Sequence, residues 1–155
     1  MFKKRFASFF ISVAVLSLFV TAGAYAQPLS SSGKTMTYIT SLKEVHGKLT
    51  GTFNYIQWYF GKDADREFLK DCGCRKEMDG APDGYYIRDA SKKLRSFPVS
   101  KSASYFLQTR SGEIKWNEKV TKKQFLQFVK TKYYVPYKIT IKNGVITSIS
   151  EQYIP

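Results

Sequence analysis

The segment from Lys48 to Phe60 constrains the fold more than any other part of this sequence. Within eight positions it places six large aromatic or aliphatic side chains: Phe53, Tyr55, Ile56, Trp58, Tyr59 and Phe60. Aromatic and β-branched residues favour strands, where successive side chains point to opposite faces. The segment therefore predicts a strand that is covered on both faces or that passes through a closed sheet, with Gly61 as its end.

Other segments predict further strands. Asn143-Gly144 is a dipeptide that strongly favours a two-residue hairpin turn, here between 137–142 and 145–150. Simple pairing across this turn places two sets of apolar residues on opposite faces of the hairpin. One face carries Tyr137, Ile139, Ile141 and Ile146, and the other carries Val145 and Ile149. The remaining predicted strands are 36–40, 85–88, an irregular edge at 94–99 limited by Pro98, and 104–109.

Two helices are predicted between the strands. Residues 62–70 have acidic side chains at the start and Lys70 at the end, as the helix dipole favours. Thr121 and Gln124 have the spacing of a capping box, and they precede an apolar stripe formed by Phe125, Phe128 and Val129. The predicted fold class is α+β, with an antiparallel, curled sheet and two short helices. A small OB-like barrel is its most specific form.

The first 26 residues have the pattern of a secretory signal peptide. Lys3, Lys4 and Arg5 precede an apolar run, and Ala24-Tyr25-Ala26 offers small residues for cleavage after Ala26. An uncleaved anchor is the alternative, but the apolar run is shorter than the roughly 20 residues of a spanning helix. We expect a flexible tether at 27–34 and a single globular domain at 35–155. We also expect the protein to be secreted, and then to be either extracellular or loosely associated with the cell wall.

The mature chain is strongly basic. The whole sequence has 25 basic and 12 acidic residues, and removal of the three basic residues of the leader leaves 22 against 12, a net charge of +10 with His46 neutral. This excess favours an anionic partner such as wall teichoic acid, nucleic acid or an acidic glycan, although it also keeps a secreted monomer soluble. The candidate anion-binding residues are Arg88, Lys92, Lys93 and Arg95.

Cys72 and Cys74 are separated by one glycine. Outside the cell a disulfide between them is the default expectation, and its very short loop would pin a local turn. Intermolecular bridging, free thiols, a metal site and a redox pair are the alternatives. A structural zinc site needs four ligands, and His46 would bring the two cysteines only to three. The thiol redox motif has two residues between its cysteines, whereas this sequence has one. No cofactor and no metal is predicted.

Catalytic signals are poor. The mature chain has one histidine, His46, which precedes Gly47 in a predicted turn. A ribonuclease-like set would combine it with Glu67 or Glu151 and with Arg88 or Arg95, but no spacing requires this set. We therefore expect a non-catalytic binding module for an anionic extracellular or cell-wall polymer. The alternative is a small secreted hydrolase, such as a nuclease using His46.

Four strings of the sequence resemble a known group of proteins. They are Trp58-Tyr59-Phe60-Gly61, Gly84-Tyr85-Tyr86-Ile87-Arg88-Asp89, Leu94-Arg95-Ser96-Phe97-Pro98-Val99 and the terminal Glu151-Gln152-Tyr153-Ile154-Pro155. In this order they are similar to strings in small exported proteins of unknown function from bacilli and actinomycetes, over about 53–155. The resemblance implies export, and it assigns no functional residue.

Overall fold

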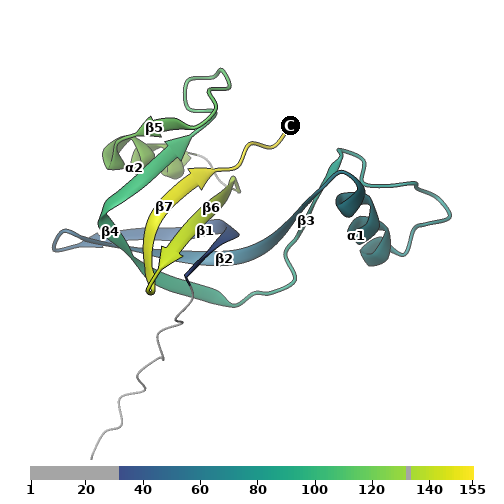
Figure 1. The fold of residues 1–155 in the computed structure, drawn as a ribbon, viewed down its shortest axis with the longest axis horizontal. Helices are drawn as coiled ribbons and strands as arrows, with labels where there is room; N and C mark the ends of the chain where they lie inside the picture. The colour runs from purple at the N-terminus through teal and green to yellow at the C-terminus, as the bar shows by residue number, and fades with distance from the viewer. Residues whose placement is uncertain (1–31, 132–133) are drawn as a thin grey trace, which may run out of the picture.

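The computed structural model describes residues 32–131 and 134–155, and these form a small β-barrel from which an arm protrudes (Figure 1). The predicted signal peptide and most of the predicted tether lie outside these residues. In chain order the elements are β1 (Gly33–Val45), β2 (Lys48–Phe60), α1 (Lys62–Cys72), β3 (Tyr85–Arg88), β4 (Leu94–Leu107), β5 (Glu118–Val120), α2 (Lys122–Thr131), β6 (Pro136–Lys142) and β7 (Val145–Glu151).

The barrel closes through five strands. The sheet order β3-β2-β1-β6-β7-β4-β5 is supplemented by pairing of β2 with β4, so that β1, β2, β4, β7 and β6 form a ring. Neighbours in this ring are antiparallel except β4 and β7, which are parallel. This order, with a helix between β4 and β6, is that of the predicted OB-like barrel. The α+β fold class is therefore confirmed.

The core fills the barrel and extends to α2. Phe125 of α2 is fully buried, with its ring centroid 4.9 Å from that of Tyr105 and 5.8 Å from that of Tyr137. The capping box is formed as predicted. The backbone N–H of Gln124 donates to Thr121 Oγ1, and the backbone N–H of Thr121 donates to the side-chain Oε1 of Gln124. The buried core cluster comprises Leu49, Phe53, Phe97, Val99, Tyr105, Leu107, Val120, Phe125, Phe128, Tyr137, Ile139, Ile141, Ile146 and Ile149.

The β6–β7 hairpin turns at Asn143-Gly144, as predicted, and both residues have positive φ angles of 50° and 75°. The predicted position of Ile149 is wrong. A β-bulge shifts the register, so that Ile141 pairs with Ile146 but Ile139 pairs with Ile149. The extra residue returns Ile149 to the core face, where it is fully buried.

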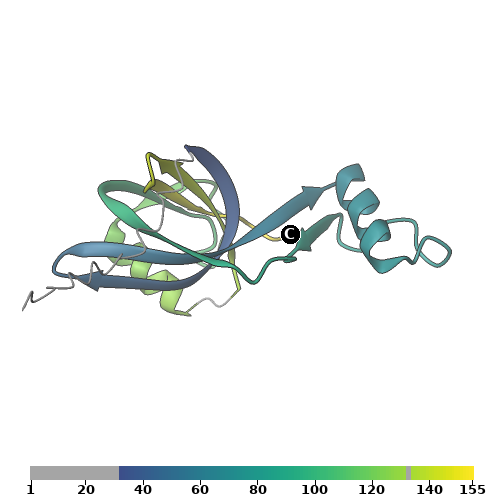
Figure 2. The same ribbon diagram turned by 90° about the horizontal axis from the view of Figure 1, so that it is seen from below.

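The arm comprises the distal part of β2 with β3, α1 and the loop between them, over residues 57–93. Gln57 to Phe60 pair with β3, beyond the part of β2 that belongs to the barrel. Figure 2 shows the arm at one end of the molecule and the turn between β1 and β2 at the other. The barrel core cluster contains no residue of the arm.

Several boundaries differ from the predictions. β1 begins at Gly33, which pairs with Ile141, so the last two residues of the predicted tether belong to the sheet. α1 runs to Cys72, and β4 is one continuous strand. Pro98 is tolerated because this part of β4 pairs with β2 alone, and β7 joins only at Val99. None of the helices in the two described ranges is long and apolar enough to cross a membrane.

Candidate functional site

Arg88, a predicted anion-binding residue, is the centre of a hydrogen-bonded network in the arm. Its guanidinium donates to the carboxylate of Asp71 at 2.6 and 2.9 Å, to Glu67 Oε2 at 2.8 Å and to the hydroxyl of Tyr59 at 3.0 Å. Arg88 holds the pKa values of Glu67 and Asp71 below their usual range through these hydrogen bonds. The side chain is 17% exposed. Two carboxylates of α1 thus balance its charge, and they hold the Arg88 side chain of β3 against α1.

The other three predicted residues follow in the connection to β4 and at its start. Lys92 Nζ lies 3.5 Å from Asp89 Oδ2, and Lys93 is exposed. The guanidinium of Arg95 lies 4.3 Å from the ring centroid of Tyr55 and donates to the carbonyl of Lys93. Lys92 and Lys93 are open to solvent, whereas Arg88 and Arg95 are packed against tyrosines. Anion binding by these four residues stays a prediction.

The structure does not bring the ribonuclease-like set together. His46 lies in the turn between β1 and β2, and Arg88 pairs with Gln57 near the far end of β2. Nine residues of strand separate Lys48 from Gln57, which is about 30 Å at 3.3 Å per residue. Glu151 is buried and accepts hydrogen bonds from the amides of Gln108 and Thr109.

The two cysteines are joined in a disulfide at the end of α1, with their Cα atoms 5.2 Å apart. Gly73 between them adopts the left-handed conformation, with a φ angle of 65°. The described part of the chain holds no cluster of three or more His, Cys, Asp or Glu side chains that could bind a metal ion.

The positive charge is distributed unequally between arm and barrel. Residues 61–93 contain eight basic and eight acidic residues, so the rest of residues 27–155 holds 14 basic and four acidic residues, an excess of +10. Three of these four acidic residues are already engaged. Glu151 is buried, Glu118 pairs with Arg110 and Glu44 pairs with Lys122. The excess positive charge therefore lies outside the arm.

The strand register collects part of this charge on one outer face of the barrel. One row across the strands, from β5 to β1, is formed by Lys119, Phe106, Ser150, Lys138 and Met36. The next row is formed by Ser104, Ser148, Thr140 and Lys34. Lys142 lies two residues beyond Thr140 on the same side of β6. We call these two rows with Lys142 the lysine face. Figure 1 shows β4, β7 and β6 side by side in this part of the barrel.

The chemistry of the lysine face suits an anion. It contains four exposed lysines, and none of the ion pairs formed among the described residues includes them. Its rows contain hydroxyl groups, one half-buried aromatic ring and no carboxylate. A groove of about 260 Å³ lies on it, lined by Lys34, Phe106, Asn117, Lys138, Thr140, Ser148 and Ser150. Ammonium and hydroxyl groups donate to phosphate, sulfate or carboxylate oxygens, and Phe106 adds an apolar contact.

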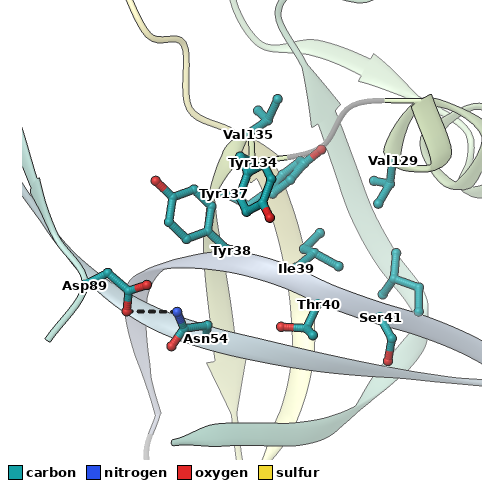
Figure 3. A pocket seen from close by; sticks show the side chains of 11 residues that line it. Tyr38, Ile39, Thr40, Ser41, Asn54, Asp89, Val129, Tyr134, Val135 and Tyr137 are labelled. Atoms are coloured by element: carbon teal, nitrogen blue, oxygen red, sulfur yellow. Dashed lines mark hydrogen bonds between the residues drawn. The ribbon is translucent and has the colours of Figure 1, made fainter. Parts of the chain in front are cut away.

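A second concavity, of about 350 Å³, lies where β1 separates from β6 (Figure 3). Pairing of β1 with β6 ends at Tyr38 opposite Pro136. Apolar and aromatic side chains from β1, α2 and the start of β6 line it, and the amide of Asn54 with the carboxylate of Asp89 forms a polar side. We call it the tyrosine pocket, because Tyr38, Tyr134 and Tyr137 all contribute to it.

Comparison with known proteins adds no assignment. No family model matches this chain, and neither does any curated protein or solved structure. The resemblance to small exported proteins of bacilli and actinomycetes therefore stays a prediction. A fold of this kind carries many functions, so the function has to be argued from the sites themselves.

Sequence reasoning missed both sites for the same reason. Lys34, Lys119 and Lys138 lie in three different strands, and only the pairing register places them on one face. The sequence did carry one usable signal, which is the contrast between the charge-balanced segment 61–93 and the strongly basic remainder. Clustering of basic residues along the chain instead predicted an anion-binding site at Arg88 and its neighbours.

Proposed function

We propose that this protein is a secreted, non-catalytic module that binds an anionic extracellular polymer through the lysine face of its barrel. The observation that carries the proposal is the register of the four lysines on a surface whose rows contain no carboxylate. Secretion and the identity of the polymer, whether wall teichoic acid, nucleic acid or acidic glycan, belong to this proposal.

The location of the face supports a polymer in place of a small anion. The two rows extend over five strands, from Lys119 on β5 to Lys34 on β1. Exposed lysines spaced along such a surface can each contact a separate charged group of a chain, and each contact releases counterions. The turns at His46-Gly47 and Asn143-Gly144 are only two residues long, so this barrel lacks the long loops there that many OB-like binding proteins use.

The test compares two variants that remove equal charge. One carries Lys34→Gln, Lys119→Gln and Lys138→Gln on the lysine face. The control carries Lys62→Gln, Lys70→Gln and Lys76→Gln, which are exposed positions on the arm. Binding to single-stranded oligothymidylate is measured by fluorescence anisotropy over a salt series, and retention on purified cell walls is measured in parallel.

We expect the lysine-face variant to bind more weakly and to show a shallower salt dependence, by up to about 2 in the logarithmic slope for three lost phosphate contacts. The arm control should keep the wild-type slope. Equal weakening of the two variants would show that net charge alone acts, and would contradict a binding face. Lys92→Gln with Lys93→Gln tests the residues that the sequence favoured, and His46→Ala should leave binding unchanged.

A further inference from the structure

We propose that the tyrosine pocket binds a single neutral sugar residue. This site is separate from the lysine face and does not depend on the function proposed for it. At about 350 Å³ the pocket lies within the range of about 300–1,000 Å³ that holds small organic ligands. Its lining comes from β1, from Asn54 of β2, from Asp89 at the base of the arm, and from Val129, Tyr134, Val135 and Tyr137, as Figure 3 shows.

One side of the pocket is apolar. Ile39 of β1 lies across from Val129 of α2 and Val135, and the ring of Tyr38 stands beside them (Figure 3). Leu42 of β1 also lines the pocket. A sugar ring has a face of C–H groups that packs against such a surface and against aromatic rings. Tyr38 and Tyr134 are arranged edge to face, with ring centroids 6.4 Å apart, so a ligand would meet the face of one ring and the edge of the other.

The opposite side offers hydrogen-bond acceptors. Asn54 Nδ2 donates to Asp89 Oδ1 at 2.9 Å, which orients the carboxylate. The two carboxylate oxygens of Asp89, whose side chain is partly exposed, can accept hydrogen bonds from ligand hydroxyls. Burial and the Asp89 charge raise the pKa of Tyr38, so its phenol remains a neutral donor.

Charge decides between a sugar and a cationic ligand. Three tyrosines and one carboxylate could also hold a quaternary ammonium group. However, Lys92 lies 3.5 Å from Asp89 and offsets its charge, on a protein whose net charge is +13. A quaternary ammonium group also has no N–H or O–H group to donate to the carboxylate oxygens of Asp89. Carboxylate oxygens beside an apolar wall, with their charge offset, therefore favour a neutral polyhydroxylated ring.

The experiment is a titration of the full mature protein followed by amide NMR, in salt high enough to suppress binding of polyanions. The probes are glucose, galactose, mannose, N-acetylglucosamine and tetramethylammonium. At least one of the sugars should shift the amides around Tyr38, Asn54 and Asp89 saturably. Changing the salt concentration should leave this affinity unaltered.

Two variants with matched controls locate the site. Tyr38→Ala should weaken binding about tenfold through loss of the packed ring, whereas Tyr153→Ala, next to Trp116 outside the pocket, should not. Asp89→Ala should also weaken binding, and Asp83→Ala on the arm should not. The Asp89 pair keeps the test valid if Tyr38→Ala fails to fold. The proposal is overturned if no sugar binds, if tetramethylammonium alone shifts these amides, or if the folded pocket variants bind as wild type does.

Discussion

Phe125 has a central place in this molecule at the scale of single residues. It connects α2 to the barrel by lying between the rings of Tyr105 and Tyr137, and its side chain has no exposed surface. Phe60 provides a natural comparison, because the same side chain is 66% exposed at the start of the arm. The two positions therefore separate the contribution of burial from that of residue type.

We expect Phe125→Ala to lower the free energy of unfolding by about 3–5 kcal/mol, because it removes buried ring contacts and leaves a cavity. Phe60→Ala should change it by less than about 0.5 kcal/mol, as for an ordinary surface position. Urea unfolding followed by circular dichroism measures both. Similar values for the two variants would mean that α2 is not docked through Phe125.

Single residues also show where sequence reasoning ends. Thr121 and Gln124 form the predicted capping box because that interaction is local and depends only on spacing. Ile149 was placed on the wrong face because a β-bulge adds one residue to β7, and nothing in the local alternation of side chains marks it. Local chemistry could be predicted from the sequence, whereas a shift in register between strands could not.

At the scale of elements, the arm depends on Arg88. This one side chain connects β3 to two carboxylates of α1, Glu67 and Asp71. Trp58 reports on the same region, because its ring stacks on that of Tyr85 across the β2–β3 pair at a centroid distance of 5.1 Å. The second tryptophan, Trp116, lies elsewhere, beside Tyr153.

The arm should loosen in acid. The pKa values of Glu67 and Asp71 are lowered in the folded state by Arg88, so their contribution to stability is complete above their unfolded pKa values near 4 and is lost as pH falls through the lowered folded values. In a Trp116→Phe background, Trp58 fluorescence should change in that acidic range. Arg88→Met should remove this transition.

The control for this prediction is Arg110→Met, which breaks a comparable pair with Glu118 on the barrel side. It should leave the Trp58 titration as it is in the parent. A Trp58 transition that survives in Arg88→Met would contradict the role given to Arg88.

Elements also differ in how well the sequence predicted them. β2, β3 and the β6–β7 hairpin were predicted from aromatic content and turn residues. β4 was divided in two because Pro98 normally ends a strand, but here one edge of the strand is unpaired and accepts it. β5 was missed altogether, since a three-residue strand has too few positions to show a pattern.

The whole molecule divides into a basic barrel and an electrically balanced arm. The core cluster lies within the barrel and α2, and the β2–β4 ladder is regular from Leu49 opposite Val99 to Asn54 opposite Leu94. Continuing that ladder would put Tyr55 opposite Lys93. A two-residue turn between these residues would then have the length of a tight hairpin.

We therefore expect a chain in which residues 56–92 are replaced by Asn-Gly to fold as a barrel and to keep its salt-sensitive binding of oligothymidylate. Its amide NMR spectrum should be dispersed, and its affinity should stay close to that of the chain that keeps the arm, because the lysine face is retained. Sugar binding should weaken, because Asn54 loses Asp89 as its partner. An unfolded product would show that the arm contributes to the stability of the barrel.

The parallel pairing of β4 with β7 also has a consequence for folding kinetics. The ring of strands is completed only when residues near the C-terminus, Ile146 to Ser150, join residues 99–106. Contacts between segments so distant along the chain form slowly, because a long loop must first be ordered. Until then β4 and β6 each present an unpaired edge that could join another copy of the chain. The protein is thus prone to aggregation until β7 is paired. Chains truncated before Val145 lack β7 and would keep both edges exposed.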